Sequence, residues 1–165
     1  MTQALNVISE PRDVASGVRK TDTIASGLAD ILADTYMLTY KTHAYHWNVE
    51  GPLFYSIHNL TEGQYEDMFA AADEVAERIR GVGQMAPMSM ADIRNRSVVD
   101  DSPETLSAGD MCKALAADHE RVAHRLHALI KISGEQNDPV TEDLATERSA
   151  FHEKAAWMLK ALVAE

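Results

Sequence analysis

Two histidines and three carboxylates lie in one central stretch of the sequence, at spacings typical of an α-helix. Imidazole and carboxylate groups together are the ligands that iron, manganese and zinc accept in proteins. His58 and Glu62 are four residues apart, so they share one face of a helix. Asp73 and Glu77 have the same spacing and share a face in the same way. The candidate metal ligands are therefore His46, His58, Glu62, Asp73 and Glu77.

One straight helix cannot bring both pairs to a single metal ion. His58 and Glu77 are 19 positions apart, which is roughly 28 Å at about 1.5 Å per residue. The two pairs are, however, symmetric about a point between Asp67 and Met68. If the helix lies antiparallel against a second copy with a two-fold axis at that point, His58 faces Glu77 of the partner subunit. Because such an interface is isologous, the spacing predicts two equivalent metal sites per dimer.

Four long amphipathic helices are predicted to carry and surround these residues. Gly51–Pro52 separates the first helix from the second. The third has a strong start at Ser102–Pro103, with Glu104 in its first turn, and the fourth begins in the same way at Asp138–Pro139. Apolar residues at helical spacing place these helices near residues 21–50, 54–80, 102–134 and 138–165.

The connection between the second and third helices is too long for a tight turn. A connection of this length can run along the whole bundle, and we expect it to contain a short helix around Ser89 to Arg94. Residues 1–21 show no sustained period and are predicted to form a flexible arm. We therefore expect an all-α, ferritin-like four-helix bundle over residues 22–165, with a long crossover between its second and third helices.

The composition of the chain excludes several classes of protein. Of its 165 residues 45% are hydrophobic and 25% are charged, which indicates a globular domain rather than a disordered one. A net charge of -11 repels polyphosphate and suits cationic partners. Cys112 is the only cysteine, which excludes an internal disulfide and fits a reducing compartment. With neither a signal-peptide core nor a run of transmembrane length, a cytoplasmic protein without a membrane partner is expected.

The central stretch, HWNVEGPLF followed by DEVAERIR, resembles the signature of the Dps family, the dodecameric mini-ferritins. The resemblance extends to DPVTEDLATERSAFHEKAAWMLKA in the last helix and covers nearly all of residues 23–165. It implies a ferroxidase for iron storage and detoxification, which oxidises Fe(II), often with hydrogen peroxide, and stores ferric mineral in a hollow shell. It further implies that His46, His58 and Glu62 of one subunit meet Asp73 and Glu77 of its two-fold mate. Many members have aspartate where this chain has Glu62, so we expect a shifted metal position.

Several other residues have both a functional and a structural interpretation. Asp138, Glu142 and Asp143 cluster at the start of the last helix. A structural role accounts for them there, because Asp138 can cap the helix and acids in a first turn complement the helix dipole. The resemblance implies an acidic three-fold pore for ion entry at this place, and Asp143 matches it best. Trp47, beside the candidate site, is placed to take up stray oxidising equivalents. Met68 is expected to pack rather than to bind haem, so no haem is expected.

The remaining histidines follow no common carboxylate pattern. His43 lies one turn before His46 and is predicted to be a polar neighbour rather than a ligand. The other four are expected at the surface or in interfaces: His119, His124, His127 and His152.

Two other functions compete with iron oxidation. Some Dps proteins compact nucleoid DNA, which requires a positive face or tail. Residues 1–22 have nearly balanced charge and the whole chain is acidic, so DNA binding and nucleoid association are the alternative rather than the expectation. Ordinary ferritins and bacterioferritins use Glu-x-x-His on single helices, and that spacing does not occur in this sequence. The expected partners are iron, hydrogen peroxide and further copies of the chain.

Overall fold

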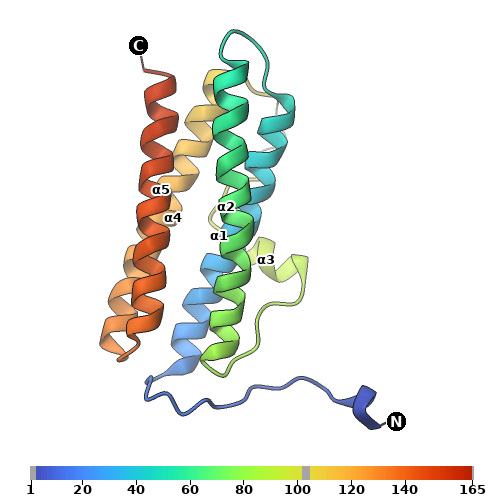
Figure 1. Ribbon diagram of the computed structural model, residues 1–165, viewed down its shortest axis with the longest axis vertical. Helices are drawn as coiled ribbons and strands as arrows, with labels where there is room; N and C mark the ends of the chain where they lie inside the picture. The colour runs from blue at the N-terminus through green and yellow to red at the C-terminus, as the bar shows by residue number, and fades with distance from the viewer. Residues whose placement is uncertain (1–2, 102–104, 165) are drawn as a thin grey trace.

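The computed structural model describes residues 3–101 and 105–164, and all regular elements within these ranges are helical. Four long helices run antiparallel in a bundle (Figure 1). Helix α1 packs mainly against α2, and α4 packs mainly against α5. This arrangement confirms the predicted all-α bundle with a long crossover between its second and third long helices. The long helices are α1 (Thr21–Asn48), α2 (Phe54–Gly81), α4 (Ala108–Glu135) and α5 (Pro139–Leu162).

The start of α5 lies where the sequence predicts it. The Asp138 side chain accepts a hydrogen bond from the Thr141 backbone N–H at 3.0 Å, and Pro139 occupies the first turn. Helix α4 begins later than predicted, at Ala108, with Ser107 as its cap. The cap predicted at Ser102–Pro103 lies outside the described residues.

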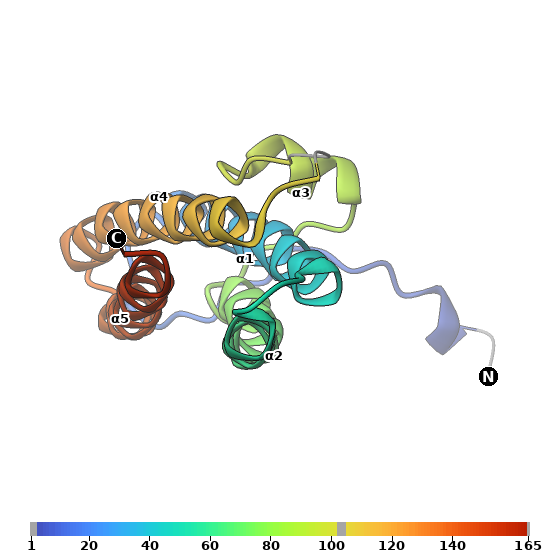
Figure 2. The same ribbon diagram turned by 90° about the horizontal axis from the view of Figure 1, so that it is seen from above.

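The predicted short helix in the crossover is present as α3 (Met90–Arg96), which packs on α1 (Figure 2). After α3 the crossover is held by the buried carboxylate of Asp34 on α1. That carboxylate accepts hydrogen bonds from the Val98 backbone N–H at 2.7 Å and the Ser97 hydroxyl at 2.9 Å. It also pairs with Arg125 of α4 at 3.0 Å. One buried charge on α1 therefore fixes the crossover between α1 and α4.

The N-terminal arm begins with a short 3-10 helix, Gln3–Asn6, and then crosses one end of the bundle in an extended path (Figure 1). The Arg12 backbone N–H donates to the Gly83 carbonyl at 2.8 Å, and the Arg19 N–H donates to the Gln136 carbonyl at 2.8 Å. Gly83 has φ 87°, and a Cβ there would lie 2.7 Å from the Arg12 carbonyl oxygen. A side chain at this position would therefore displace the arm.

The core is apolar along most of the bundle, and Met68 packs in it with 0% exposure. His119 and His152 are also in the core, at 0% and 1% exposure, so their expected place at a surface or interface is wrong. Their burial is tolerated because their ring nitrogens hydrogen-bond to each other. His124 and His127 are exposed, as expected. Within the described ranges, no helix is both long and apolar enough to cross a membrane.

Candidate metal-binding site

His46 and His58 meet where the antiparallel helices α1 and α2 are joined. Their rings stack with centroids 3.7 Å apart and planes 18° from parallel. His46 Nδ1 lies 2.9 Å from the His58 carbonyl oxygen, and His58 Nδ1 lies 3.0 Å from the His46 carbonyl oxygen. A carbonyl oxygen only accepts, so each Nδ1 must be the donor. In the neutral tautomer that donates from Nδ1, Nε2 carries the lone pair that can bind a metal ion.

This reciprocal bonding is the arrangement that prepares an imidazole to bind a metal ion. A ligating histidine typically donates its other ring N–H to a carbonyl or carboxylate, which fixes the tautomer and the orientation of the ring. The Thr61 hydroxyl supports the arrangement by donating to the His58 carbonyl at 3.1 Å and to the Ile57 carbonyl at 2.8 Å. The two stacked rings are thus held in place by hydrogen bonds within one chain.

The third predicted ligand of this group, Glu62, follows His58 by one turn of α2 and is exposed. Its carboxylate lies near the phenol of Tyr65. Desolvation, followed by the negative charges of Glu62 and Glu66, raises the pKa of Tyr65 above its usual value. A carboxylate that is exposed and flanked by another is well suited to attract a cation.

Asp73 and Glu77 lie further along the same helix and are exposed. The described residues contain no group of three or more histidine, cysteine or acidic side chains arranged to hold a metal ion within one chain. A single chain therefore presents two imidazoles and Glu62 where α1 and α2 are joined, and two carboxylates further along α2. Their convergence across a two-fold axis stays a prediction.

Aromatic rings surround the histidine pair on one side. Trp47 is 57% exposed and its ring lies 4.0 Å from that of His43. His43 in turn stacks on Tyr65 at 4.0 Å, and the Tyr65 ring meets that of His46 edge-on at 5.2 Å. His43 thus packs between Trp47 and Tyr65, and its role as a polar neighbour rather than a ligand stays a prediction. The sequence interpretation missed Tyr65, although its position one turn after Glu62 was a usable signal.

The three acids at the start of α5 are not equivalent. Asp138 has 0% exposure and pairs with Arg78 of α2 at 2.6 Å, in addition to capping the helix. Its carboxylate is therefore committed within the subunit and is unavailable to line a pore. Glu142 is half-buried and Asp143 is exposed. Ion entry at an acidic pore stays a prediction for these two residues.

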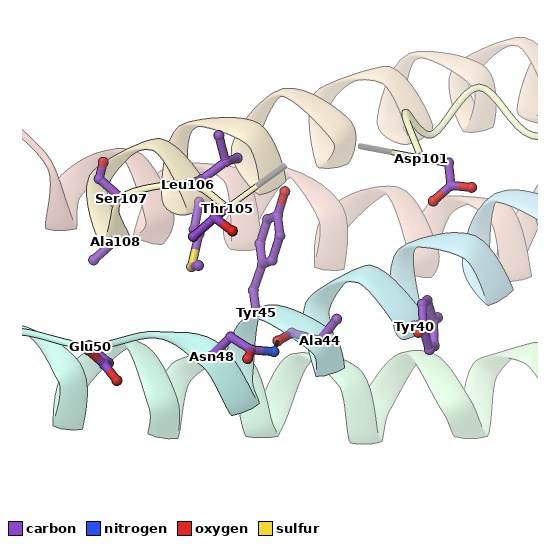
Figure 3. A pocket seen from close by; sticks show the side chains of 11 residues that line it. Tyr40, Ala44, Tyr45, Asn48, Glu50, Asp101, Thr105, Leu106, Ser107 and Ala108 are labelled. Atoms are coloured by element: carbon purple, nitrogen blue, oxygen red, sulfur yellow. Dashed lines mark hydrogen bonds between the residues drawn. The ribbon is translucent and has the colours of Figure 1, made fainter. Parts of the chain in front are cut away.

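A cavity of about 780 Å³ lies apart from the candidate ligands, between the end of α1 and the start of α4. Figure 3 shows Tyr45 of α1 pointing across it toward the segment that leads into α4. None of the predicted metal ligands lines this cavity. The candidate metal ligands thus lie outside this cavity, on α2 and at the end of α1.

Comparisons with known proteins agree with this architecture. The sequence matches the ferritin-like domain family over residues 25–165. It is 34% identical over 149 residues to an uncharacterized low temperature-induced protein of Nostoc, covering 87% of this chain and 83% of that protein. It is 31% identical over 132 residues to DNA protection during starvation protein 2 of Bacillus anthracis, covering 80% and 90% of the two chains. The crystal structure of Dps from Staphylococcus aureus is similar with a TM-score of 0.85 and 28% identity, covering 90% of this chain and 99% of that one.

Proposed function

Because the chain belongs to the Dps family of ferritin-like proteins, we propose that it oxidises Fe(II) at sites shared between two subunits. The ferric product is stored inside a closed, dodecameric shell. The observation that carries this proposal is the reciprocal hydrogen bonding of His46 and His58, which leaves both Nε2 atoms free to bind a metal ion. The buried, single Cys112 is consistent with work in the reducing cytoplasm.

The exposed face of α2 supports a site completed by a second subunit. His58, Glu62, Asp73 and Glu77 follow one another along this helix at spacings that keep them on one stripe. Phe69 lies on the same stripe and is 65% exposed. A large apolar side chain amid exposed acids is typical of a surface that another chain covers. A two-fold partner packed on this stripe buries Phe69 and brings the two groups of ligands together.

The ligand set suits oxidation of Fe(II). Ligands rich in carboxylate oxygen, with two imidazoles, match the hardness of ferric iron better than that of ferrous iron. Hydrogen peroxide accepts one electron from each of two Fe(II) ions and, with two protons, is reduced to two water molecules. When both electrons are delivered at one site, the one-electron step that yields hydroxyl radical is avoided.

Peroxide treatment of the Fe(II)-loaded protein should therefore release little hydroxyl radical. The protein is loaded with Fe(II) without oxygen, hydrogen peroxide is added, and radicals are counted with a spin trap. The spin adduct should fall well below that from the same Fe(II) without protein. His58→Ala, which lacks one ligand, should give a signal close to that of free iron. If the wild-type protein and free iron give equal signals, protection from radicals is not its function.

The chain is not expected to bind duplex DNA near neutral pH and physiological salt. The net charge is -11 per chain, and DNA binding draws most of its free energy from phosphate contacts with basic residues. Gel retardation without divalent cations measures this directly, because such cations bridge two anionic surfaces. A shifted band whose affinity falls steeply with salt would instead reveal a basic surface and favour the DNA-compacting alternative.

A further inference from the structure

The bundle core contains a pair of histidines that the proposed iron chemistry does not use. His119 of α4 and His152 of α5 are 0% and 1% exposed, and their Nδ1 atoms are 2.8 Å apart. A hydrogen bond between two ring nitrogens requires one to donate and the other to accept. The pair in this geometry therefore shares a single proton between its Nδ1 atoms. This bond ties α4 to α5 in the interior of the subunit.

A positive charge lies beside the pair. Arg148 precedes His152 by one turn of α5, and its guanidinium carbon lies 4.5 Å from the centre of the Phe151 ring. The Phe151 ring in turn meets the His152 ring edge-on at 5.1 Å. Arg148 is 8% exposed, so water screens its charge poorly. A proton added to either histidine would thus be repelled by a neighbouring cation.

The nearby carboxylates are committed to other cations. Asp67 of α2 accepts from Arg148 at 2.6 Å. Asp118, which precedes His119 on α4, pairs with Lys41 of α1 at 2.7 Å and with Arg121 of its own helix. Among the described residues, no carboxylate of α1, α2, α4 or α5 hydrogen-bonds to either histidine, and His119 Nε2 has no partner. An imidazolium here would be a buried charge without a counter-ion.

Burial, followed by the charge of Arg148, lowers the pKa of His119 to about 3. Burial, followed by the charges of His119 and Arg148, lowers the pKa of His152 well below 6.5. In the unfolded chain both rings have ordinary pKa values near 6.5. The stability from these neutral rings is therefore fully present above about pH 6.5, and it decreases as the pH falls, because only the unfolded state gains protons.

We propose that His119 and His152 form an acid-sensitive latch between α4 and α5, which weakens this hairpin when the protein enters a mildly acidic environment. In the folded hairpin, a first added proton would bury a charge beside Arg148, and a second would make both Nδ1 atoms donors and break the bond. The two rings therefore take up protons when the hairpin opens, so a lower pH favours the open state. Acid therefore acts on the interior of each subunit, independently of any metal ligand.

The test compares urea unfolding of the full-length assembly at one protein concentration, between about pH 7.5 and 4.5. In the wild type, each of the two rings should increase the unfolding equilibrium constant by up to tenfold for every unit that the pH falls below about 6.5. The double variant His119→Leu/His152→Met fills the core without titrating and should lose this part of the pH dependence. The variant His124→Gln removes an exposed histidine of α4 and should keep the wild-type slope. Equal slopes for the double variant and the wild type would overturn the latch.

Hydrogen exchange of the wild-type protein gives a second readout should the double variant fail to fold. At acidic pH, after correction for intrinsic exchange rates, peptides of α4 and α5 should lose protection before those of α1 and α2. Simultaneous loss of protection in all four helices would show that acid acts elsewhere.

Discussion

Mixed assemblies of two inactive variants should recover about a quarter of the wild-type oxidation sites. Alone, His58→Ala and Glu77→Ala should each reduce Fe(II) oxidation to the slow rate of iron without protein, because each removes a ligand from every site. The two ligands are too far apart on α2 to serve one site within a chain. If a two-fold partner completes the site, each variant can supply the ligand that the other lacks.

The expected recovery follows from symmetry. Random mixing of equal amounts makes half of the dimers mixed. In a mixed dimer one site carries both substitutions. The other takes His58 from the Glu77→Ala chain and Glu77 from the His58→Ala chain, and is intact. Unfolding and reassembling the two variants together, with mixing verified by native mass spectrometry, should therefore restore about a quarter of the fast phase in stopped-flow oxidation.

A second mixture provides the matched control. His46→Ala and His58→Ala remove ligands predicted to come from the same subunit, so a mixed dimer of these two has a defect in both sites. This mixture should recover no fast oxidation. If both mixtures stay at the level of the single variants, the sites are not shared between chains. Equal recovery in both mixtures would show that the ligands are grouped differently.

The features that follow from local spacing were predictable from the sequence. The first turn of α5 was one, because the Asp138–Pro139 cap needs no information from the rest of the chain. The start of α4 was not, because Ser107 is also an efficient cap. The choice between two caps depends on tertiary contacts, which here include the anchoring of the crossover to Asp34.

Side-chain pairing across helices was not predictable in the same way. His119 lies at helical spacing between Leu115 and Val122, both buried, and that position indicated a core residue. Its partner His152 lies on another helix, so the bond that permits its burial has no sequence signal. The same holds for the reciprocal bonding of the two candidate ligands, which depends on how closely α1 and α2 approach. Residue types thus indicated the candidate ligands, whereas the ring nitrogen that donates in each histidine could be identified only from the fold.

The substitution Asp34→Ala should lower the free energy of unfolding by about 3 kcal/mol, since breaking a buried ion pair leaves its partner uncompensated. Asp34 is 0% exposed and is the acceptor for Ser97, the Val98 backbone N–H and Arg125. Without the carboxylate, the Val98 N–H and the Ser97 hydroxyl lose their acceptor. The crossover after α3 should then exchange amide hydrogens faster than the helices that it connects.

Asp30 offers a control on the same helix, one turn earlier. Its carboxylate also pairs with Arg125, at 3.2 Å, and with Arg96, at 3.0 Å, but its side chain is 32% exposed. Asp30→Ala should therefore cost only about 1 kcal/mol or less, as is usual for ion pairs in contact with water. Denaturant unfolding of both variants at the wild-type protein concentration, with hydrogen exchange of residues 97–100, measures the difference. If the two substitutions cost the same, the surface ion pairs rather than the buried carboxylate hold the crossover in place.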